Sequence, residues 1–366
     1  MSFHQTSTSD LPNHLQSESN NNFISTSIQF LDELNQSLLL AILSSFENYK
    51  PKIIQSLLFP LSKLSHKKSA VTLNLRIQPK NKKLEVLFMK RVERNGDVWS
   101  GHVCFPGGKF EENVDKNLYD TAVRETCEEI GVNLSGDSFN VKYIGRADDH
   151  LAQGNLPVSC FVFLWNYYTV TNENQVISNV KYNINPTEVG GIRWVPLDLF
   201  ISNPNNRQRV KTIQVDEFGN KTITNSLSFH MGLVFPRLKQ MLGEHNIRKL
   251  IVNFPCIEIP VNPHDLDDEN ISDLQNPQLK FVLWGLTLRI LSNFLRIIHE
   301  SLPLLNYDYD TENRIVDFLT QYSNRFARNF LTQYETDESS PIPRSERLPT
   351  SNSNHTTELL SRISKL

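Results

Sequence analysis

One helical segment lies between two groups of strand candidates, and this order constrains the fold more than any other feature of the chain. Residues 70–77 (AVTLNLRI) and 84–92 (LEVLFMKRV) are rich in aliphatic residues, and the polar stretch QPKNKK between them predicts a hairpin. Beyond the helix, VKYIGRA, VSCFVFLW and VGGIRWVPL have the same strand character. Strands on both sides of a helix predict an α/β fold, in which a mixed sheet carries helices on its faces.

The central helix has clear local boundaries. The stretch before it, GHVCFPGG (101–108), predicts a third strand that ends in a Gly-Gly turn. Asp115 or Asn117 can cap the start of the helix, which we expect to run to about Ile130 and to end at Gly131.

Helical patterns also lie outside this centre. Residues 28–49 (IQFLDELNQSLLLAILSSFENY) space their apolar side chains as a helix does. Residues 281–298 (FVLWGLTLRILSNFLRII) form the longest apolar stretch, but Arg289, Asn293 and Arg296 interrupt it. We therefore predict a helix packed on the sheet there, and no membrane span.

Composition divides the chain into four parts. Residues 1–25 are rich in Ser, Asn and Thr, which predicts disorder, and residues 26–67 are expected to form an N-terminal helical cap. Residues 68–302 are expected to form the main domain with its C-terminal packing helix. Residues 303–366 turn polar again, and we expect a largely disordered tail.

The charge balance limits the possible partners. The chain has 37 basic and 40 acidic residues, a net charge of −3, which gives no general field for nucleic acid or a membrane surface. An anionic substrate must therefore be bound locally, by a metal ion or a few basic side chains. The 4 cysteines form no CxxC pair, which favours a reduced intracellular protein and gives little support to a zinc site.

Three glutamates are crowded at the end of the central helix. Glu125, Glu128 and Glu129 stand at positions i, i+3 and i+4, so they share one face. Such a stripe is often no more than a solvated surface. Here the helix follows a Gly-Gly turn, and carboxylate and carbonyl oxygens that converge on one point suit Mg²⁺ or Mn²⁺. The metal would relieve the repulsion and bind a phosphate group.

Residues 124–132 (RETCEEIGV) resemble the Nudix box, whose pattern is G-x5-E-x7-R-E-U-x-E-E-x-G-U with U a bulky aliphatic residue. Thr126 departs from the pattern at a U position. Counting back from the arginine, the family glycine falls on Phe110 and the family glutamate on Lys116, so the turn is longer here. The resemblance implies a Nudix-type α/β/α sandwich with a mixed sheet, N-terminal helices and disordered tails.

The longer turn is similar to that of one Nudix branch, the coenzyme A diphosphatases, which carry a pattern like G-x-V-x-F-P-G-G-x-x-D-x-x-D. The matching positions are Gly101, Val103, Phe105, Pro106, Gly107 and Gly108, followed by Glu112 and Asp115 with one extra residue between. Other similar stretches are LPVSCFVFLW, IRWVPLDLF, NFPCIEIP and VLWGLTLRI, so the resemblance covers about residues 70–300.

The resemblance implies metal-dependent hydrolysis of a pyrophosphate bond. For coenzyme A the products would be 3′,5′-ADP and 4′-phosphopantetheine. Glu125, Glu128 and Glu129 are the implied metal ligands, with the backbone carbonyl of Gly108 as a further one. Glu128 could act as general base, and Arg124 could orient a glutamate through a bidentate bond. An ordinary surface ion pair is the alternative for this arginine.

The substrate contacts are less well defined by the sequence. Lys109 and Arg91 could bind phosphate or lie on a solvated surface. Trp99 stands where the coenzyme A branch has a histidine, and it could stack on adenine or fill the core. This departure leaves open another nucleoside diphosphate substrate, such as NADH or an oxidised nucleotide. A binding module without turnover is a further alternative.

Three other features complete the predictions. Asp148, Asp149 and His150 could supply a ligand or base, but a polar turn is favoured. Cys104 and Cys127 have no evident base beside them, so both are interpreted as packing residues. The last three residues, 364–366 (SKL), match a signal read by the peroxisomal import receptor, which predicts a peroxisomal location unless this ending is accidental.

Overall fold

The computed structural model describes thirteen stretches of the chain. They are residues 28–54, 67–94, 101–134, 141–152, 156–165, 168–170, 176–178, 180–201, 212–215, 221–224, 226–230, 251–259 and 281–299. The expected disordered segments 1–25 and 303–366, the SKL ending and Trp99 lie outside these described residues. The boundaries of the four expected parts therefore stay predictions.

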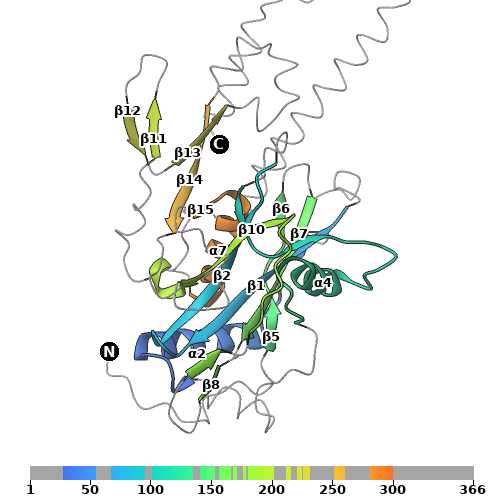
Figure 1. Ribbon diagram of the computed structural model, residues 1–366, viewed down its shortest axis with the longest axis vertical. Coiled ribbons are helices and arrows are strands. Elements are labelled where there is room, and N and C mark those ends of the chain that lie inside the picture. Colours follow the sequence, from blue (N-terminus) through green and yellow to red (C-terminus); the bar gives the residue numbers. More distant parts are fainter. Residues whose placement is uncertain are drawn as a thin grey trace, which may run out of the picture. The chain divides into compact units, whose positions relative to one another are not determined.

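A mixed sheet forms the centre of the fold (Figure 1). Its strand order is β10-β2-β1-β7-β5, and three short strands extend it: β3 beside β2, β4 beside β1 and β6 beside β7. Strands β1 and β7 run parallel, while β1 and β2, β2 and β10, and β5 and β7 run antiparallel. The bounds are β1 (Ser69–Gln78), β2 (Lys83–Arg91), β3 (Val103–Cys104), β4 (Gly107–Lys109), β5 (Val141–Arg146), β6 (His150–Ala152), β7 (Leu156–Trp165) and β10 (Val189–Pro196).

The expected α/β fold with a mixed sheet is confirmed, including its first hairpin. Leu75 pairs with Val86 and Gln78 with Lys83 across β1 and β2. Lys82 in the connecting turn has a φ of 59°. The predicted third strand is divided into β3 and β4, with Pro106, which lacks a backbone N–H, between them.

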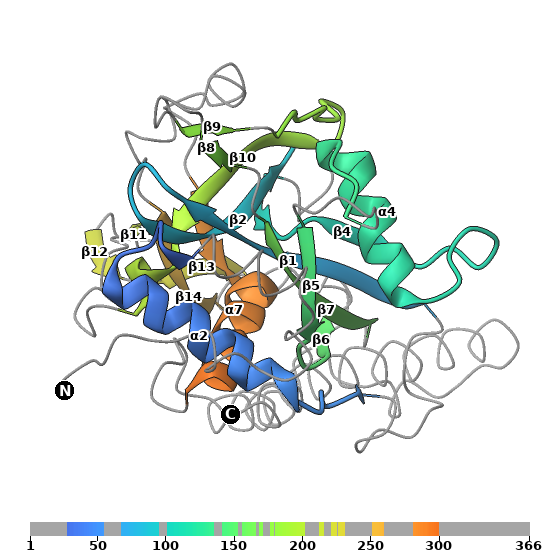
Figure 2. The same ribbon diagram turned by 90° about the horizontal axis from the view of Figure 1, so that it is seen from below.

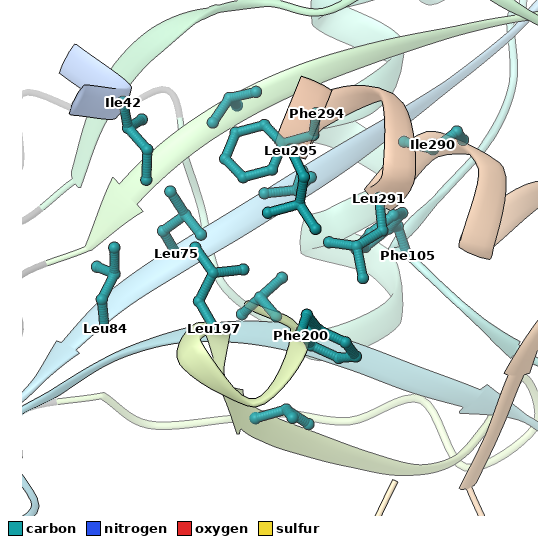
Figure 3. Close-up of a cluster of buried hydrophobic side chains, with 14 of the residues drawn as sticks. Ile42, Leu75, Leu84, Phe105, Leu197, Phe200, Ile290, Leu291, Phe294 and Leu295 are labelled. Atoms are coloured by element: carbon teal, nitrogen blue, oxygen red, sulfur yellow. The ribbon is translucent and has the colours of Figure 1, made fainter. Parts of the chain in front are cut away.

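Two helices cover one face of the sheet (Figure 2). Helix α2 (Glu33–Glu47) starts at Asp32, whose carboxylate accepts the backbone N–H of Asn35 at 2.9 Å. Helix α7 (Gly285–Ile298) lies beside it in the same apolar layer. Their buried side chains meet Leu73, Leu75 and Ile77 of β1. Figure 3 shows α7 contributing Ile290, Leu291, Phe294 and Leu295 to this cluster.

Helix α4 (Leu118–Ile130) covers the opposite face (Figure 2). Asn117 caps its start by accepting the backbone N–H groups of Tyr119 and Asp120, and Gly131 ends it with a φ of 75°. Both ends therefore confirm the expected boundaries. Ala122 and Ile130 are buried in a second apolar cluster together with residues of β2, β7 and β10.

The stretch predicted as a helix from residue 281 begins instead as a strand. Residues of β15 (Phe281–Trp284) pair antiparallel with the end of β14 (Ile251–Ile259), as in Cys256 opposite Trp284. The helix begins only at Gly285, which has a φ of 58°. A short apolar run has no periodicity that separates strand from helix, and available pairing decides which one forms.

The remaining elements are short. They are the 3-10 helix η4 (Leu197–Phe200) and the strands β8 (Tyr168–Val170), β9 (Val176–Ser178), β11 (Thr212–Val215), β12 (Lys221–Thr224) and β13 (Ser226–His230). The chain divides into two units, and the elements of the central sheet, α2, α4 and α7 belong to the first. Of the second unit, the structure describes only residues 227–230 and 251–254. Among the described helices, none is long and apolar enough to cross a membrane.

Candidate active site

The turn before α4 brings its backbone close to the helix. Gly107 has a φ of 147°, and a Cβ there would lie 2.2 Å from the carbonyl oxygen of Ala70, so only glycine fits. At Gly108 a Cβ would lie 2.3 Å from the carboxyl carbon of Glu125. The Gly-Gly pair therefore lets a glutamate carboxylate lie directly against the main chain.

Glu129 is held at this turn. Its Oε2 accepts the backbone N–H of Gly107 at 2.8 Å, and the residue is only 7% exposed. Burial raises the pKa of Glu129 to about 8, and the charges of Glu125 and Glu188 add to this rise. The turn thus presents an N–H group to Glu129, whereas the sequence suggested converging carbonyls.

Glu125 lies beside Glu129 in a similar environment. Its pKa is raised by burial above all, and the charges of Glu128 and Glu188 also raise it, against the opposing effect of Arg124. Burial and mutual repulsion thus make the charged forms of Glu125 and Glu129 costly. A bound cation would remove that cost, since it attracts both carboxylates.

Arg124 binds the carboxylates around it. Its Nε donates to Asp115 Oδ1 at 2.8 Å and its Nη2 to Asp115 Oδ2 at 3.0 Å, a bidentate pair. Other bonds reach Glu128 Oε2 at 2.9 Å, the carbonyl of Lys109 at 3.1 Å and Glu125 Oε1 at 3.2 Å. The arginine therefore joins the turn to two of the three candidate glutamates.

Asp115 is a site residue to which the sequence gave no such role. The arginine side chain lowers its pKa to about 2, helped by hydrogen bonds from the Glu111 backbone and the Thr121 hydroxyl. The family pattern places a glutamate at Lys116, one position later. In the sequence, the acidic pair Glu112 and Asp115 was the signal that could have indicated a partner for Arg124. In the structure, Asp115 is that partner.

Glu128 differs from the other two glutamates. Its side chain is 54% exposed, and it is paired with Arg124. Among the described residues, no three side chains of His, Cys, Asp or Glu converge on one point as they stand. The carbonyl of Gly108 accepts the hydroxyl of Ser69, and Gly108 also pairs with Ala70 in the ladder of β1 and β4, so its role as a metal ligand stays a prediction. The donor set nevertheless fits a hard divalent cation, because Glu129 is buried, Glu125 is partly buried, and burial raises the pKa values of both carboxylates.

The loop before β10 is hydrogen-bonded to the C-terminal end of α4. The backbone N–H groups of Asn183 and Asn185 donate to the carbonyls of Ile130 and Glu129, at 3.1 Å and 2.9 Å. These are terminal carbonyls that α4 itself leaves without a partner. The loop thereby places Glu188 close enough to raise the pKa values of both Glu125 and Glu129. Sequence reasoning missed this residue, because no motif links it to the helix.

The candidate phosphate contacts differ in what supports them. Arg91 is near the site, because its charge opposes the rise in the pKa of Glu129. Lys109 is exposed, and its carbonyl is the group that contacts Arg124. Its role in binding phosphate stays a prediction, as does that of Trp99.

The expected polar turn at Asp148, Asp149 and His150 is wrong. These residues are only 2%, 3% and 0% exposed, and His150 begins β6. Asp148 accepts Tyr49 Oη at 2.7 Å, the backbone N–H of Lys52 at 2.7 Å and Asn293 Nδ2 at 3.0 Å. These partners come from α7 and from the segment after α2, so the aspartate joins the helical layer to the sheet.

None of the four cysteines is in a disulfide bond. Burial raises the pKa of the Cys104 thiol, which agrees with a packing role. Cys127 is exposed on α4, so its interpretation as a packing residue is wrong. Thr126 turns inward to the sheet, whereas Cys127 and Glu128 fall on the outer side of the helix.

Comparison with known proteins identifies the class. Residues 68–214 match the model of the NUDIX domain, so the chain contains a Nudix domain. It is 30% identical over 140 residues to a peroxisomal coenzyme A diphosphatase of Caenorhabditis elegans. The matched region covers 38% of this chain and 51% of that protein. It is 31% identical over 138 residues to an uncharacterised protein of Schizosaccharomyces pombe, which covers 36% of each.

Both matches span about half or less of these relatives. Among solved structures, an Ap4A hydrolase of Caenorhabditis elegans matches with 15% identity and a TM-score of 0.27, over 36% of this chain and 81% of that one.

Proposed function

We propose that the chain hydrolyses the pyrophosphate bond of coenzyme A or one of its derivatives and uses Mg²⁺ or Mn²⁺ to do so. The observation that carries the proposal is the pair of glutamates at the Gly107-Gly108 turn, Glu129 buried and Glu125 partly buried, both with raised pKa values. Buried carboxylates of this kind favour a cation, and a cation in turn favours a pyrophosphate.

Glu125 and Glu129 would hold the metal, and Glu128 would join them by leaving Arg124. When bound, the metal supplies charge neutralisation at the phosphoryl oxygens and lowers the pKa of water. The carbonyl of Gly108 would be a further ligand if its bond from the Ser69 hydroxyl were given up.

The residues of the chain then have distinct roles. Arg124, fixed by Asp115, keeps the glutamate helix at the turn. Arg91 and Lys109 bind phosphate oxygens. Glu128 is exposed enough to accept a proton from water, whose oxygen forms a bond to one phosphorus. The bond from that phosphorus to the bridging oxygen breaks, and the products are 3′,5′-ADP and 4′-phosphopantetheine.

The choice of coenzyme A rests on two supports. One is the printed function of the Caenorhabditis elegans relative. The other is the turn: its sequence VCFPGGK resembles that of the coenzyme A branch and places Gly108 against Glu125, and Asp115 in the segment after it binds Arg124.

A substrate panel tests this proposal. The full chain is incubated with Mg²⁺ and coenzyme A, acyl-coenzyme A, NADH or 8-oxo-dGTP, and products are separated by mass. We expect kcat/KM to be highest for a coenzyme A species. Higher kcat/KM for NADH or 8-oxo-dGTP would overturn the substrate, and binding without turnover of any compound would indicate a non-catalytic module.

A peroxisomal location is the second part of the proposal. It rests on residues 364–366 and on the printed name of the relative. A fluorescent protein fused to the N-terminus should mark peroxisomes, and removal of these three residues should leave it in the cytosol. Unchanged peroxisomal fluorescence after removal would show that the import receptor does not read this ending.

A further inference from the structure

Position 126 carries a hydroxyl where the Nudix box has an aliphatic residue. Thr126 is fully buried, and its hydroxyl donates to the carbonyl of Ala122 at 2.7 Å. The same oxygen lies 2.8 Å from the hydroxyl oxygen of Thr72 in β1, which is also fully buried. A buried hydroxyl in place of a methyl group is costly unless it is paired, and here it is paired twice.

These hydroxyls belong to a chain of hydrogen bonds. The indole N–H of Trp165 donates to Asn74 Oδ1 at 3.1 Å, and Asn74 Nδ2 donates to Thr72 Oγ1 at 2.8 Å. If the proton of Thr126 goes to Ala122, the Thr72 hydroxyl donates to Thr126; the other acceptor within its reach is the carbonyl of Pro106, at 3.5 Å. In either direction, the chain of bonds runs from β7 through β1 to α4.

Thr72 also holds the turn. Its backbone N–H donates to the carbonyl of Pro106 at 2.8 Å, and the next residue, Gly107, donates its N–H to Glu129. Thr72 of β1 thus contacts the glycine turn (Pro106–Gly108) through its backbone and the glutamate helix (α4, which carries Glu125 and Glu129) through its side chain. Thr126 itself directly follows Glu125 in that helix.

We propose that the Thr72–Thr126 hydrogen bond positions the glutamate helix against the glycine turn, so that Glu125 and Glu129 meet the divalent cation at the right spacing. Thr126 is then a positioning residue, which acts through the metal-binding glutamates. An aliphatic side chain packs without a preferred direction, whereas a hydrogen bond fixes both distance and angle. This inference rests on the proposed metal-dependent function.

Mn²⁺ binding, followed by electron paramagnetic resonance on the purified full chain, tests the inference without any substrate. Thr126→Val keeps the shape and removes the bond, and we expect it to weaken Mn²⁺ binding about tenfold, as loss of a supporting contact at a metal site does. Thr126→Ser keeps the hydroxyl and should bind as the parent does. In an assay with saturating substrate, Thr126→Val should need more Mg²⁺ for half-maximal rate while kcat at saturating Mg²⁺ is retained.

Thr287→Val is the matched control. Thr287 in α7 is also buried and also donates its hydroxyl to a backbone carbonyl, that of Val103, at 3.0 Å. Equal weakening of Mn²⁺ binding in Thr126→Val and Thr287→Val would show only a general loss of stability and would overturn the inference. Parent-like binding by Thr126→Val would overturn it directly.

Two further outcomes separate the inference from the function on which it rests. If Thr126→Val fails to fold, Thr72→Val breaks the same bond from the strand, and the same weakening is expected. If the parent binds no Mn²⁺, the proposed function fails, and the inference fails with it. If the parent binds Mn²⁺ and both Thr126→Val and Thr72→Val bind it as tightly as the parent does, only the inference fails.

Discussion

The two faces of strand β1 are both buried, yet they are made of different residues. Leu73, Leu75 and Ile77 face α2 and α7 and belong to a wholly apolar cluster. The alternate residues include Thr72 and Asn74, which lie under α4 and are also 0% exposed. On this face Asn74 donates to the hydroxyl of Thr72, which is in turn hydrogen-bonded to Thr126, the residue after Glu125.

The difference indicates a division of roles. Apolar contacts are non-directional, so the apolar cluster beneath α2 and α7 can supply stability without itself fixing any single distance, and the bonds of Asp148 hold the helices there. The α4 face contains hydrogen bonds and ion pairs, which fix distances, and it carries the glutamates. Substitutions on the first face should therefore reduce stability, and those on the second should reduce function.

Phe294→Ala should have the largest effect on stability. Phe294 in α7 is 0% exposed, and loss of a buried phenylalanine costs about 3 to 5 kcal/mol. Chemical denaturation measures this, and the activity per folded molecule should stay unchanged. Leu34→Ala is the control, since Leu34 is 48% exposed and its loss should cost little. If folded Phe294→Ala lost activity, the claim that the α2–α7 face contributes only to stability would be contradicted.

Glu129→Gln should have the largest effect on activity. It removes the charge of a metal ligand but keeps its size, so we expect kcat/KM to fall about 100-fold or more with little change in stability. Initial rates with Mg²⁺ and the best substrate of the panel measure the effect. Glu33→Gln, at an exposed position of α2, should act as the parent does. Equal rates for Glu129→Gln and the parent would remove this glutamate from the mechanism.

Gly108→Ala tests the close approach of turn and helix. Its Cβ would lie 2.3 Å from the Glu125 carboxyl, so the glutamate must move, and we expect activity to fall about 10- to 100-fold. Gly190→Ala provides the contrast, because the nearest atom to its Cβ is 3.6 Å away, an ordinary contact. If both variants keep full activity, the position of Glu125 does not matter.

The smallest effect concerns pH. The pKa of Asp115 is lowered from 3.8 to about 2 in the folded protein. Its ion pair with Arg124 therefore adds stability above pH 3.8, and this is lost as the pH falls toward 2. At pH 7 the free energy of unfolding of Asp115→Asn should be about 1 to 2 kcal/mol lower than that of the parent, and this difference should be smaller at pH 3. If urea unfolding gave the same stability difference between parent and variant at pH 7 and at pH 3, the lowered pKa of Asp115 would not contribute to stability.

Local signals predicted much of this fold correctly. Asn117 and Gly131 bound α4 as expected, because capping depends on residues next to the helix. The burial of Asn74 could not be predicted, since alternation tells which residues share a face but not what covers it. The strand at 281–284 was missed for a related reason, as its pairing partner comes from residues 256–259.

The candidate site shows the same limit. The box pattern predicted the glutamates and Arg124, but counting along it pointed to Lys116, while the three-dimensional partner is Asp115. Asp148 was interpreted as a turn residue because its partners Tyr49 and Asn293 are 99 and 145 positions away. Contacts between residues so distant in the sequence leave no local pattern.

The central claim is that Glu125 and Glu129, held at the Gly107-Gly108 turn, bind a divalent cation. Anomalous X-ray diffraction from crystals of the full chain grown with Mn²⁺ tests it most directly. We predict a manganese peak within bonding distance of a carboxylate oxygen from each of these glutamates. A fully ordered site with no such peak, in protein that hydrolyses its substrate with Mn²⁺ in solution, would contradict the claim.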